Sequence, residues 1–426
     1  MSHRTPTRLV PALLALSLGC NGDHDDSTPL IAQDVDVEAV VLYETVEGTA
    51  SPQRRWIPVD LSVSPQGRLW AVQRLPRHPD FNDETECTTG FVGDCAGLNG
   101  STAAILHPFA PAAATAENGR VDLVIDHNAW HFMRRPSGIA FGAEETGIDP
   151  DDPGAMDPDT NQSTLDERTY YPDIFATCSE HFTGNLTDGG PYNGPTLWTA
   201  DPDIYNGENG PYSWSNGAHL DMVHGTEYCM GITWEYDNRY WLLNGSLGTI
   251  DHYDFVAPHV PGHFYHGDSE VMRFDLGNHA FTRVVDVPSN LVQVDAELVF
   301  ADSGGGRVIQ MDTASGTPDG TWFTAEGIQG DLFVSPATSV LLSEQTLTQE
   351  WGGGPIPSGL AYLGDDLLVV GNNASGHLTI FERDGTIVRT IDTGLGAGMG
   401  GITTLDGTIF IAHMEHKTVY RLDVVE

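Results

Sequence analysis

Lysine is almost missing from this chain: Lys417 is the only one, and 19 basic residues stand against 60 acidic residues. The resulting formal net charge of −41 makes nucleic acid a poor partner, because its phosphates would be repelled. A field of this sign attracts cations, and it equally suits solubility in a salty or extracellular medium. The charge therefore excludes one class of partner without naming a function.

Long apolar runs are also lacking. Residues 9–18 form an apolar run behind Arg4 and Arg8, and this run is too short to span a bilayer as a mature helix. It predicts an export signal over residues 1–20, followed by a flexible tether over 21–35. The run ends at Cys20 and resembles a bacterial lipoprotein signal, which implies a lipidated Cys20 in the cell envelope, facing the periplasm or the exterior. Ser17 stands where that signal carries Leu or Val, so ordinary cleavage and secretion stay open.

Cysteines are few, and their number is odd. If Cys20 is lipidated, the other four form an even set that suits an oxidising compartment. Cys87 and Cys95 flank a short Gly-containing loop and pair most simply with each other, which leaves Cys178 for Cys229. The other connectivities are not excluded by the sequence.

Helical periodicity is absent, and a short phrase recurs six times instead. Its third residue is Gly, Asn or Asp, the residue types that best tolerate a left-handed backbone, so a sharp turn is expected to open a strand at each phrase. The third residues are Asp60, Gly138, Gly231, Asn290, Gly359 and Gly401.

A second run rich in β-branched and aromatic residues follows each phrase, which predicts one small antiparallel sheet per phrase. These runs cover residues 69–72, 174–177, 240–243, 298–301, 367–370 and 408–412. Gly359 and Gly401 are 42 positions apart, a normal propeller period, whereas the wider spacings of the earlier phrases require insertions, concentrated in blades 1 to 3.

The last repeat is too short for four strands, because only 25 residues follow Gly401. Residues 37–45 read as a strand without a sheet, so we expect this N-terminal strand to complete the last blade. Residues 298–308 resemble an NHL repeat. That resemblance implies an all-β fold, a six-bladed β-propeller over residues 36–426, and we expect a monomer.

Histidines at repeated offsets are the main candidates for metal ligands. His131 and His224 each lie seven residues before a phrase glycine, which predicts that they meet at the channel mouth and share a zinc or copper ion. Ordinary structural histidines are the alternative. Further candidate ligands in the loops of the same face are His181, His219, His413 and His416, and Met133, Met222, Met230, Met399 and Met414 would favour copper if they are more than packing residues.

Two insertions carry weaker metal patterns. Residues 251–268 contain His252, His259, His263 and His266, which predict either a second metal site, a lid over the channel or a surface loop. A second insertion alternates oxygen-bearing side chains as calcium loops do, although Gln162 and Arg168 break the pattern. The candidate calcium ligands are Asp157, Asp159, Asn161, Ser163 and Asp166.

Familiar catalytic motifs are missing, and Gly396-x-Gly398-x-x-Gly401 precedes a strand rather than the helix of a dinucleotide site. The layout is similar to that of peptidyl-hydroxyglycine amidating lyase, an NHL propeller whose zinc histidines stand directly before the third phrase residue. In this chain those positions are Ser137, Met230, Ser289, Ser358 and Gly400, so its histidines are not matched.

We therefore expect a cell-envelope propeller that binds a small ligand, peptide or envelope protein at a His-rich mouth with a divalent metal ion. One alternative is a metal-dependent lyase or hydrolase with Glu227 or Glu180 as base and Tyr228 or Arg134 as electrostatic partner. The other is a metal-free interaction scaffold. Nucleic acid is not expected as a partner, and the membrane is contacted only through the lipid anchor.

Overall fold

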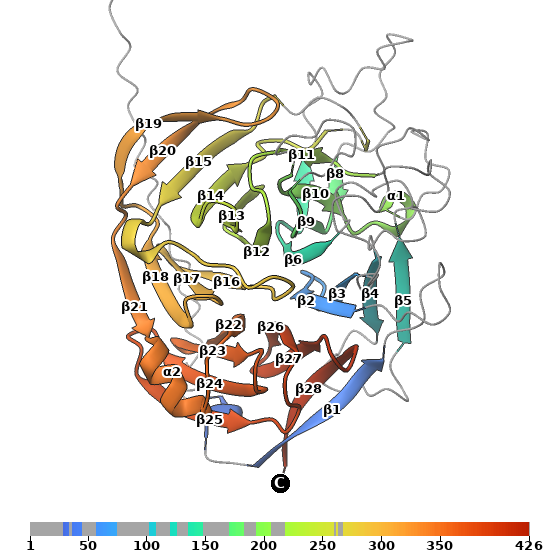
Figure 1. The fold of residues 1–426 in the computed structure, drawn as a ribbon. Helices are drawn as coiled ribbons and strands as arrows, with labels where there is room; N and C mark the ends of the chain where they lie inside the picture. The colour runs from blue at the N-terminus through green and yellow to red at the C-terminus, as the bar shows by residue number, and fades with distance from the viewer. Residues whose placement is uncertain are drawn as a thin grey trace, which may run out of the picture.

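Small antiparallel sheets stand in a ring around a common axis, and they make this protein an all-β propeller (Figure 1). The computed structural model describes residues 29–33, 36–44, 57–74, 102–107, 120–125, 135–147, 170–182, 193–205, 218–259, 261–262 and 267–425. The innermost strands contact one another in the order β2, β6, β12, β16, β22 and β26, and β26 contacts β2.

Five sheets have four strands each, and hydrogen bonds join neighbouring strands from the inner edge of each sheet outward. The first is β2 (Ile57–Val63), β3 (Leu69–Arg74), β4 (Thr102–His107) and β5 (Arg120–Ile125); the second is β6 (Pro136–Phe141), β9 (Ile174–Ser179), β10 (Thr196–Thr199) and β11 (Asp221–Met222). Next come β16 (Leu291–Val294), β17 (Glu297–Asp302), β18 (Arg307–Asp312) and β21 (Thr338–Leu342), then β22 (Pro357–Gly364), β23 (Leu367–Asn372), β24 (His377–Glu382) and β25 (Ile387–Asp392). The fifth is β26 (Met399–Leu405), β27 (Thr408–His413), β28 (Thr418–Val425) and β1 (Asp36–Glu44).

The predicted count of six blades is wrong, since five four-stranded blades are found and the remaining position in the ring holds a six-stranded sheet. Its strands are β12 (Cys229–Trp234), β13 (Arg239–Asn244), β14 (Thr249–Asp254), β15 (Glu270–Asp275), β20 (Gln329–Val334) and β19 (Thr317–Phe323). The hairpin β19–β20 leaves the neighbouring blade between β18 and β21, and β20 pairs in parallel with β15. The extension covers the outer edge that β15 would otherwise expose.

Smaller elements decorate the ring. A two-stranded ribbon forms from β7 (Glu145–Gly147) and β8 (Tyr170–Pro172). The helices are α1 (Pro202–Tyr205) and α2 (Glu344–Trp351), with short 3-10 turns η1 (Leu30–Ala32) and η4 (Gly277–His279). Ser343 caps α2 by accepting a hydrogen bond from the Thr346 amide, and Gly352 ends the helix in the left-handed region.

The N-terminal strand closes the ring as predicted. Strand β1 runs antiparallel to β28, from Asp36 opposite Val425 to Glu44 opposite Thr418 (Figure 1). The sheet made by β1, β28, β27 and β26 therefore contains both ends of the described chain. Closure of this kind leaves no long open edge inside the ring.

The second strand of each blade is buried on both faces, because side chains alternate along a strand and both neighbouring blades are apolar. In β17, Leu298 and Phe300 pack into the cluster shared with the preceding blade, while Val299 and Ala301 pack into the cluster shared with the next one. Strands buried on two sides need almost continuous apolar sequence, which is why the second run of each repeat is recognisable.

The phrase residues play a different role from the one predicted. None of the six third residues has a positive φ, so the left-handed turn is wrong. Their small size is needed for packing: a Cβ on Gly231 would lie 1.9 Å from the Ser289 carbonyl oxygen, and one on Gly401 would lie 1.9 Å from Asp60 Oδ1. Glycine at these positions lets the backbones of neighbouring blades approach one another at the axis.

Candidate functional site

One end of the ring gathers charged side chains, and we call this end the mouth. The first strands of the blades begin there and the second strands end there, because the two run antiparallel. Arg74 ends β3, Arg135 immediately precedes β6, and Glu180 immediately follows β9. The connection from β15 to β16 brings Arg283 and Asp286 to the same end.

Glu180 is the centre of this group. It is fully buried, and its carboxylate receives guanidinium groups from different blades. Arg74 Nη1 lies 3.3 Å away, Arg283 Nη1 lies 3.2 Å away, and Arg135 Nη2 lies 3.5 Å away. A carboxylate buried to this degree is stable as an ion only with such partners. The side chains of the three arginines are 5%, 24% and 13% exposed, respectively.

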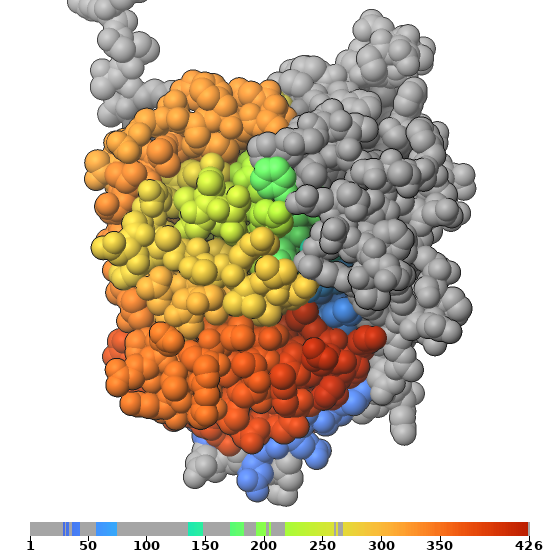
Figure 2. Space-filling view, in the orientation of Figure 1, coloured from blue at the N-terminus to red at the C-terminus, as the bar shows by residue number. Residues whose placement is uncertain are grey.

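Asp286 completes the mouth cluster, a name we use for Glu180, Arg74, Arg135, Arg283 and Asp286. Its amide donates to Glu180 Oε1 at 3.0 Å, and its carbonyl accepts from Arg74 Nη2 at 2.6 Å. Its carboxylate pairs with Arg135, and its φ of 70° is strained for a residue with a side chain. These bonds hold the β15–β16 connection toward the centre of the ring. The connection belongs to the yellow segment in the middle of the described face (Figure 2).

An aromatic wall adjoins the mouth cluster. The Arg283 guanidinium stacks on the Tyr228 ring at 3.7 Å from its centroid, and the Phe182 ring lies 5.9 Å from the same ring. Tyr228 has a φ of 50°, which is uncommon for an aromatic residue and turns the chain into β12. Charged and apolar groups therefore meet at one place on the mouth.

Beneath the mouth, side chains fill the axis of the ring. Asp60 is fully buried and accepts hydrogen bonds from the Ile139 amide at 3.0 Å and from Asn290 Nδ2 at 2.8 Å. Asn290 Oδ1 accepts in turn from the Ile402 amide at 3.2 Å. These bonds join four blades. Burial raises the pKa of the Asp60 carboxyl group to about 6.

His413, at the end of β27, is buried as well. Burial, helped by the neighbouring His416, lowers the pKa of the His413 imidazole to about 4. The two rings stack with their centroids 3.9 Å apart, and His413 Nδ1 accepts from the His416 amide at 3.2 Å. This acceptor role is lost if Nδ1 is protonated.

Asp60 and His413 are expected to affect stability with opposite signs between about pH 4 and 6.5. Folded Asp60 binds its proton near pH 6 and unfolded Asp60 near 3.8, so its contribution to the unfolding free energy rises as the pH falls through this window. Folded His413 stays neutral down to about pH 4 while the unfolded imidazole binds a proton near 6.5, so its contribution falls on acidification. Urea unfolding should show a steeper acid loss for Asp60→Asn than for the wild type, and a shallower loss for His413→Gln, by on the order of 1–3 kcal/mol. Identical pH profiles for all three proteins would contradict both pKa directions.

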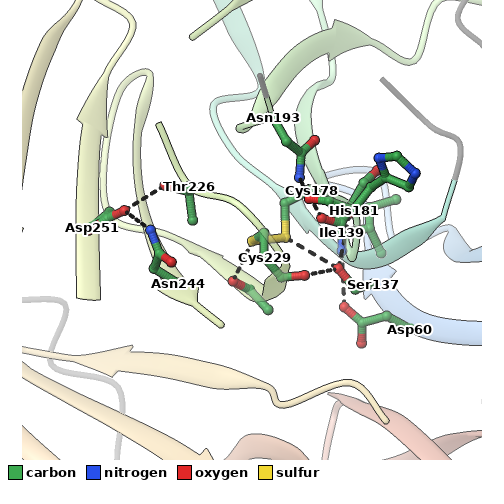
Figure 3. Close-up of a disulfide and its surroundings, with 12 residues drawn as sticks. Asp60, Ser137, Ile139, Cys178, His181, Asn193, Thr226, Cys229, Asn244 and Asp251 are labelled. Atoms are coloured by element: carbon green, nitrogen blue, oxygen red, sulfur yellow. Dashed lines mark hydrogen bonds between the residues drawn. A yellow bond between two sulfur atoms is a disulfide. The ribbon is translucent and has the colours of Figure 1, made fainter. Parts of the chain in front are cut away.

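Glu227 belongs to a second polar network beside the mouth. Asp251 is fully buried and accepts from Thr226 Oγ1 at 2.7 Å and from Asn244 Nδ2 at 2.9 Å (Figure 3). It also accepts from Arg273 Nε at 2.7 Å. Burial raises the pKa of Glu227, against the opposing effect of Arg273. A carboxyl group of this kind keeps its proton to a higher pH than an exposed one does, as a proton donor or acceptor in catalysis requires.

A disulfide joins the blades under this face. Cys178 at the end of β9 is bonded to Cys229 at the start of β12, which confirms the predicted pairing (Figure 3). The bond is compatible with an extracytoplasmic protein. The other predicted pair, Cys87 with Cys95, lies outside the described residues, as does Cys20.

The positions that hold zinc histidines in amidating lyase serve in this chain as structural links. Ser137 Oγ donates to the Cys178 carbonyl at 3.3 Å, and Ser358 Oγ donates to the Met399 carbonyl at 2.9 Å. A serine hydroxyl does not replace the imidazole nitrogen of a zinc histidine. Met230 offers only a thioether at its position, and Gly400 has no side chain. The zinc site of that enzyme therefore does not fit these residues.

The predicted histidine ligands that the structure describes each have identifiable neighbours. His224 Nδ1 contacts Glu326 in the β19–β20 turn, His219 packs edge-on against Trp198, and the His181 carbonyl accepts from Asn193 Nδ2. His413 and His416 form their own stack in another blade. His131 and Arg134 are outside the described residues, and so are the calcium candidates Asp157, Asp159, Asn161, Ser163 and Asp166, and His263 and His266.

One group with the spacing of metal ligands is found in the part of the chain that the structure describes. It consists of Asp221, His259 and Asp268, whose ligand atoms all lie within 4.8 Å of one another. His259 is one of the four histidines of the 251–268 insertion. Asp221 and Asp268 join it from β11 and from the residues before β15.

The arginines of the mouth cluster were not anticipated from the sequence. A usable signal existed, because Arg74 ends the second strand of its blade and Arg135 stands directly before a phrase. In a chain with so few basic residues, three at mouth positions are informative.

Comparison with known proteins shows no family for this chain. No protein-family profile matches the chain, and no curated protein matches it. Solved structures with a similar chain course include streptogramin B lyase (12% identity, 92% of this chain and 98% of that chain, TM-score 0.41) and virginiamycin B lyase from Staphylococcus aureus (10%, 92% and 100%, 0.42). The RRP9 WD40 repeats are similar to the same extent (10%, 92% and 100%, 0.40). Similarity this low transfers no activity. Separately, no helix in the described residues has the length and apolar character to cross a membrane.

Proposed function

We propose that this protein is an extracytoplasmic binding propeller that takes a ligand carrying a carboxylate group at its mouth. The observation that carries the proposal is the convergence of Arg74, Arg135 and Arg283 on Glu180. Among the described residues, three guanidinium groups face two carboxylates there, so the mouth cluster itself has a net charge of +1 in a chain whose net charge is −41. The mouth is thus the place where an anionic group is attracted.

Asp286 occupies the position that a ligand carboxylate would take. Its side chain is 40% exposed while its partner Arg135 is 13% exposed, so the carboxylate lies on the solvent side of the guanidinium. A ligand carboxylate can replace it and form the paired hydrogen bonds that arginine makes with planar anions. The strained φ of Asp286 favours release of this contact.

The Tyr228 and Phe182 rings define the second half of the ligand. They lie beside Arg283, so a ligand with an apolar or aromatic part next to its carboxylate fits the mouth better than a bare anion. Small aromatic acids and the C-terminus of a peptide both have this character. Attachment to the cell envelope through Cys20, and an NHL-type repeat, are parts of the same proposal.

Calorimetric titration with benzoate, N-acetyl-phenylalanine and their uncharged amides tests the proposal. The acids should bind and the amides should not, and Arg135→Gln should weaken binding by about 10–100-fold because a charge-assisted hydrogen bond is lost. Asp286→Asn should strengthen it by removing the competing carboxylate. Arg239→Gln is the matched control, since Arg239 pairs with Asp254 at the opposite ends of the strands. Equal behaviour of acids and amides would leave the interaction scaffold as the better description.

A lyase or hydrolase acting at the same mouth is a second candidate. Glu227 supports it, because this carboxyl group is 9% exposed, has a raised pKa and directly precedes Tyr228. In that version the arginines hold the substrate carboxylate and Glu227 transfers a proton. Its metal-assisted form depends on His131 together with His224, and this pair stays a prediction. Turnover that disappears in Glu227→Gln while ligand affinity persists would distinguish the enzyme from the binding protein.

A further inference from the structure

The boundary between the second blade and the six-stranded sheet carries the group Asp221, His259 and Asp268, which we call the boundary triad. Asp221 opens β11, the outermost strand of its blade, whereas His259 and Asp268 come from the connection between β14 and β15. The side chains of Asp221 and His259 are fully buried, and that of Asp268 is 29% exposed. Two chain segments from two blades thus bring an imidazole and two carboxylates together.

The distances in the boundary triad match those between metal ligands. His259 Nε2 lies 3.1 Å from Asp268 Oδ1 and 3.7 Å from Asp221 Oδ2. Ligand bonds of about 2.1 Å at tetrahedral angles place neighbouring ligand atoms roughly 3.4 Å apart. The two distances bracket this value, so a shift of a few tenths of an ångström in each carboxylate gives both distances the right length.

Backbone contacts hold the triad in place independently of any ion. The His259 amide donates to the Leu220 carbonyl at 2.8 Å, and the Gly262 amide donates to the His219 carbonyl at 2.8 Å. These bonds dock the β14–β15 connection along the segment that leads into β11. Ser269 Oγ lies 3.5 Å from Asp221 Oδ2 and supports that carboxylate, as residues around metal ligands do.

The other histidine–carboxylate contacts on this sheet differ from the triad. His252 Nε2 lies 2.7 Å from Glu235 Oε2, and His224 Nδ1 contacts Glu326. Within the described residues neither pair is joined by a third His, Cys, Asp or Glu at ligand distance. A shared proton accounts for a histidine beside one carboxylate. An imidazole beside two carboxylates instead offers one nitrogen and two oxygen ligands to a single divalent cation.

We infer that the boundary triad binds one divalent transition-metal ion, with zinc as the best fit. One imidazole nitrogen and two carboxylate oxygens suit zinc, whereas calcium and magnesium prefer oxygen ligands alone. Asp268 reaches solvent, so water can fill the fourth position from that side. The ion fastens the β14–β15 connection to the neighbouring blade, and this role is independent of ligand binding at the mouth.

Zinc binding by the full chain, produced without a histidine tag and stripped with a chelator, tests the inference. Titration calorimetry with Zn²⁺ should give one tight site and a rise in the thermal midpoint. Removing one of three ligands in His259→Gln should lower the affinity by about 100-fold or more, and Asp268→Asn, at a partly exposed position, should lower it by at least about 10-fold. His252→Gln is the matched control and should bind zinc like the wild type.

Far-ultraviolet circular dichroism in the presence of chelator verifies that each variant is folded. A folded His259→Gln protein that binds zinc like the wild type overturns the inference, and so does a folded wild-type protein that binds none. Loss of zinc in His224→Gln with full binding in His259→Gln overturns it as well, because the ion would then lie at the predicted mouth site. Failure of benzoate binding with normal zinc binding would concern the mouth proposal alone.

Discussion

Replacing Glu180 by alanine should lower the free energy of unfolding by about 3–5 kcal/mol, because a buried ion loses its counter-charge. Glu180 is fully buried and receives three guanidinium groups, of which Arg74 is itself only 5% exposed. Without the carboxylate these arginines repel one another in a place that water barely reaches. Urea unfolding followed by tryptophan fluorescence measures the loss.

A pair with the same chemistry at the surface provides the control for Glu180. Glu297 lies 2.9 Å from Arg383 Nη2 but its side chain is 36% exposed. Glu297→Ala should therefore lower the unfolding free energy by less than about 1 kcal/mol. An equal loss of unfolding free energy in Glu180→Ala and Glu297→Ala would show that the mouth cluster does not hold the blades together. The cluster would then have a role in ligand binding alone.

The double variant Cys178→Ala/Cys229→Ala should lose about 4 kcal/mol of stability. The bond closes a loop of 51 positions, and closure of a loop this long removes much of the entropy of the unfolded chain. Alanine avoids placing new polar atoms in the buried site that the two sulfurs occupy. Urea unfolding under non-reducing conditions measures the loss, and peptide mapping by mass spectrometry verifies the pairing.

The predicted Cys87–Cys95 pair offers an internal comparison for this result. Its loop is much shorter, so Cys87→Ala/Cys95→Ala should lose less, about 2–3 kcal/mol in the same chain-entropy description. Equal losses in the two double variants, or none in Cys178→Ala/Cys229→Ala, would contradict the expectation that the longer cross-link dominates.

Local sequence patterns were enough to predict the strands that line the ring. The second runs at 298–301 and 367–370 are almost wholly apolar because both of their faces are buried, and a pattern of that kind is visible without knowing the partner. Strand β1 was predictable for a different reason. The last repeat was too short for four strands, and residues 37–45 formed a predicted strand that belonged to no other sheet.

Features that depend on contacts between distant segments were predicted less well. The hairpin β19–β20 is part of the chain between β18 and β21, but it pairs with β15 of the preceding sheet. A parallel pairing across blades has no local signature, so the blade count was overestimated. The phrase glycines were read as turn residues for the same reason, because the backbone that approaches Gly231 belongs to Ser289 in the next blade.

The candidate site was predicted in place more than in composition. Glu180 was recognised as a mouth residue from its position after the second strand, and it lies at the centre of the mouth cluster. Histidines at the same distance before two phrase glycines were predicted as ligands. Arg74 ends a second strand and Arg283 lies in the connection from β15 to β16, so these two arginines share no repeated position. Which side chains meet across a channel depends on the lengths of the connections, and the sequence does not reveal how these fold.

The pairing of β1 with β28 has a consequence for biogenesis. A ribosome produces β1 (Asp36–Glu44) long before β28 (Thr418–Val425), so the partner of β1 is missing while the residues between these two strands are synthesised. In a polypeptide that stops before Thr418, the backbone groups of β1 and β27 that normally pair with β28 have no strand to pair with. Unpaired strand edges of this kind promote aggregation. The eight residues of β28 therefore act as a checkpoint, because only polypeptides that contain them can complete the ring.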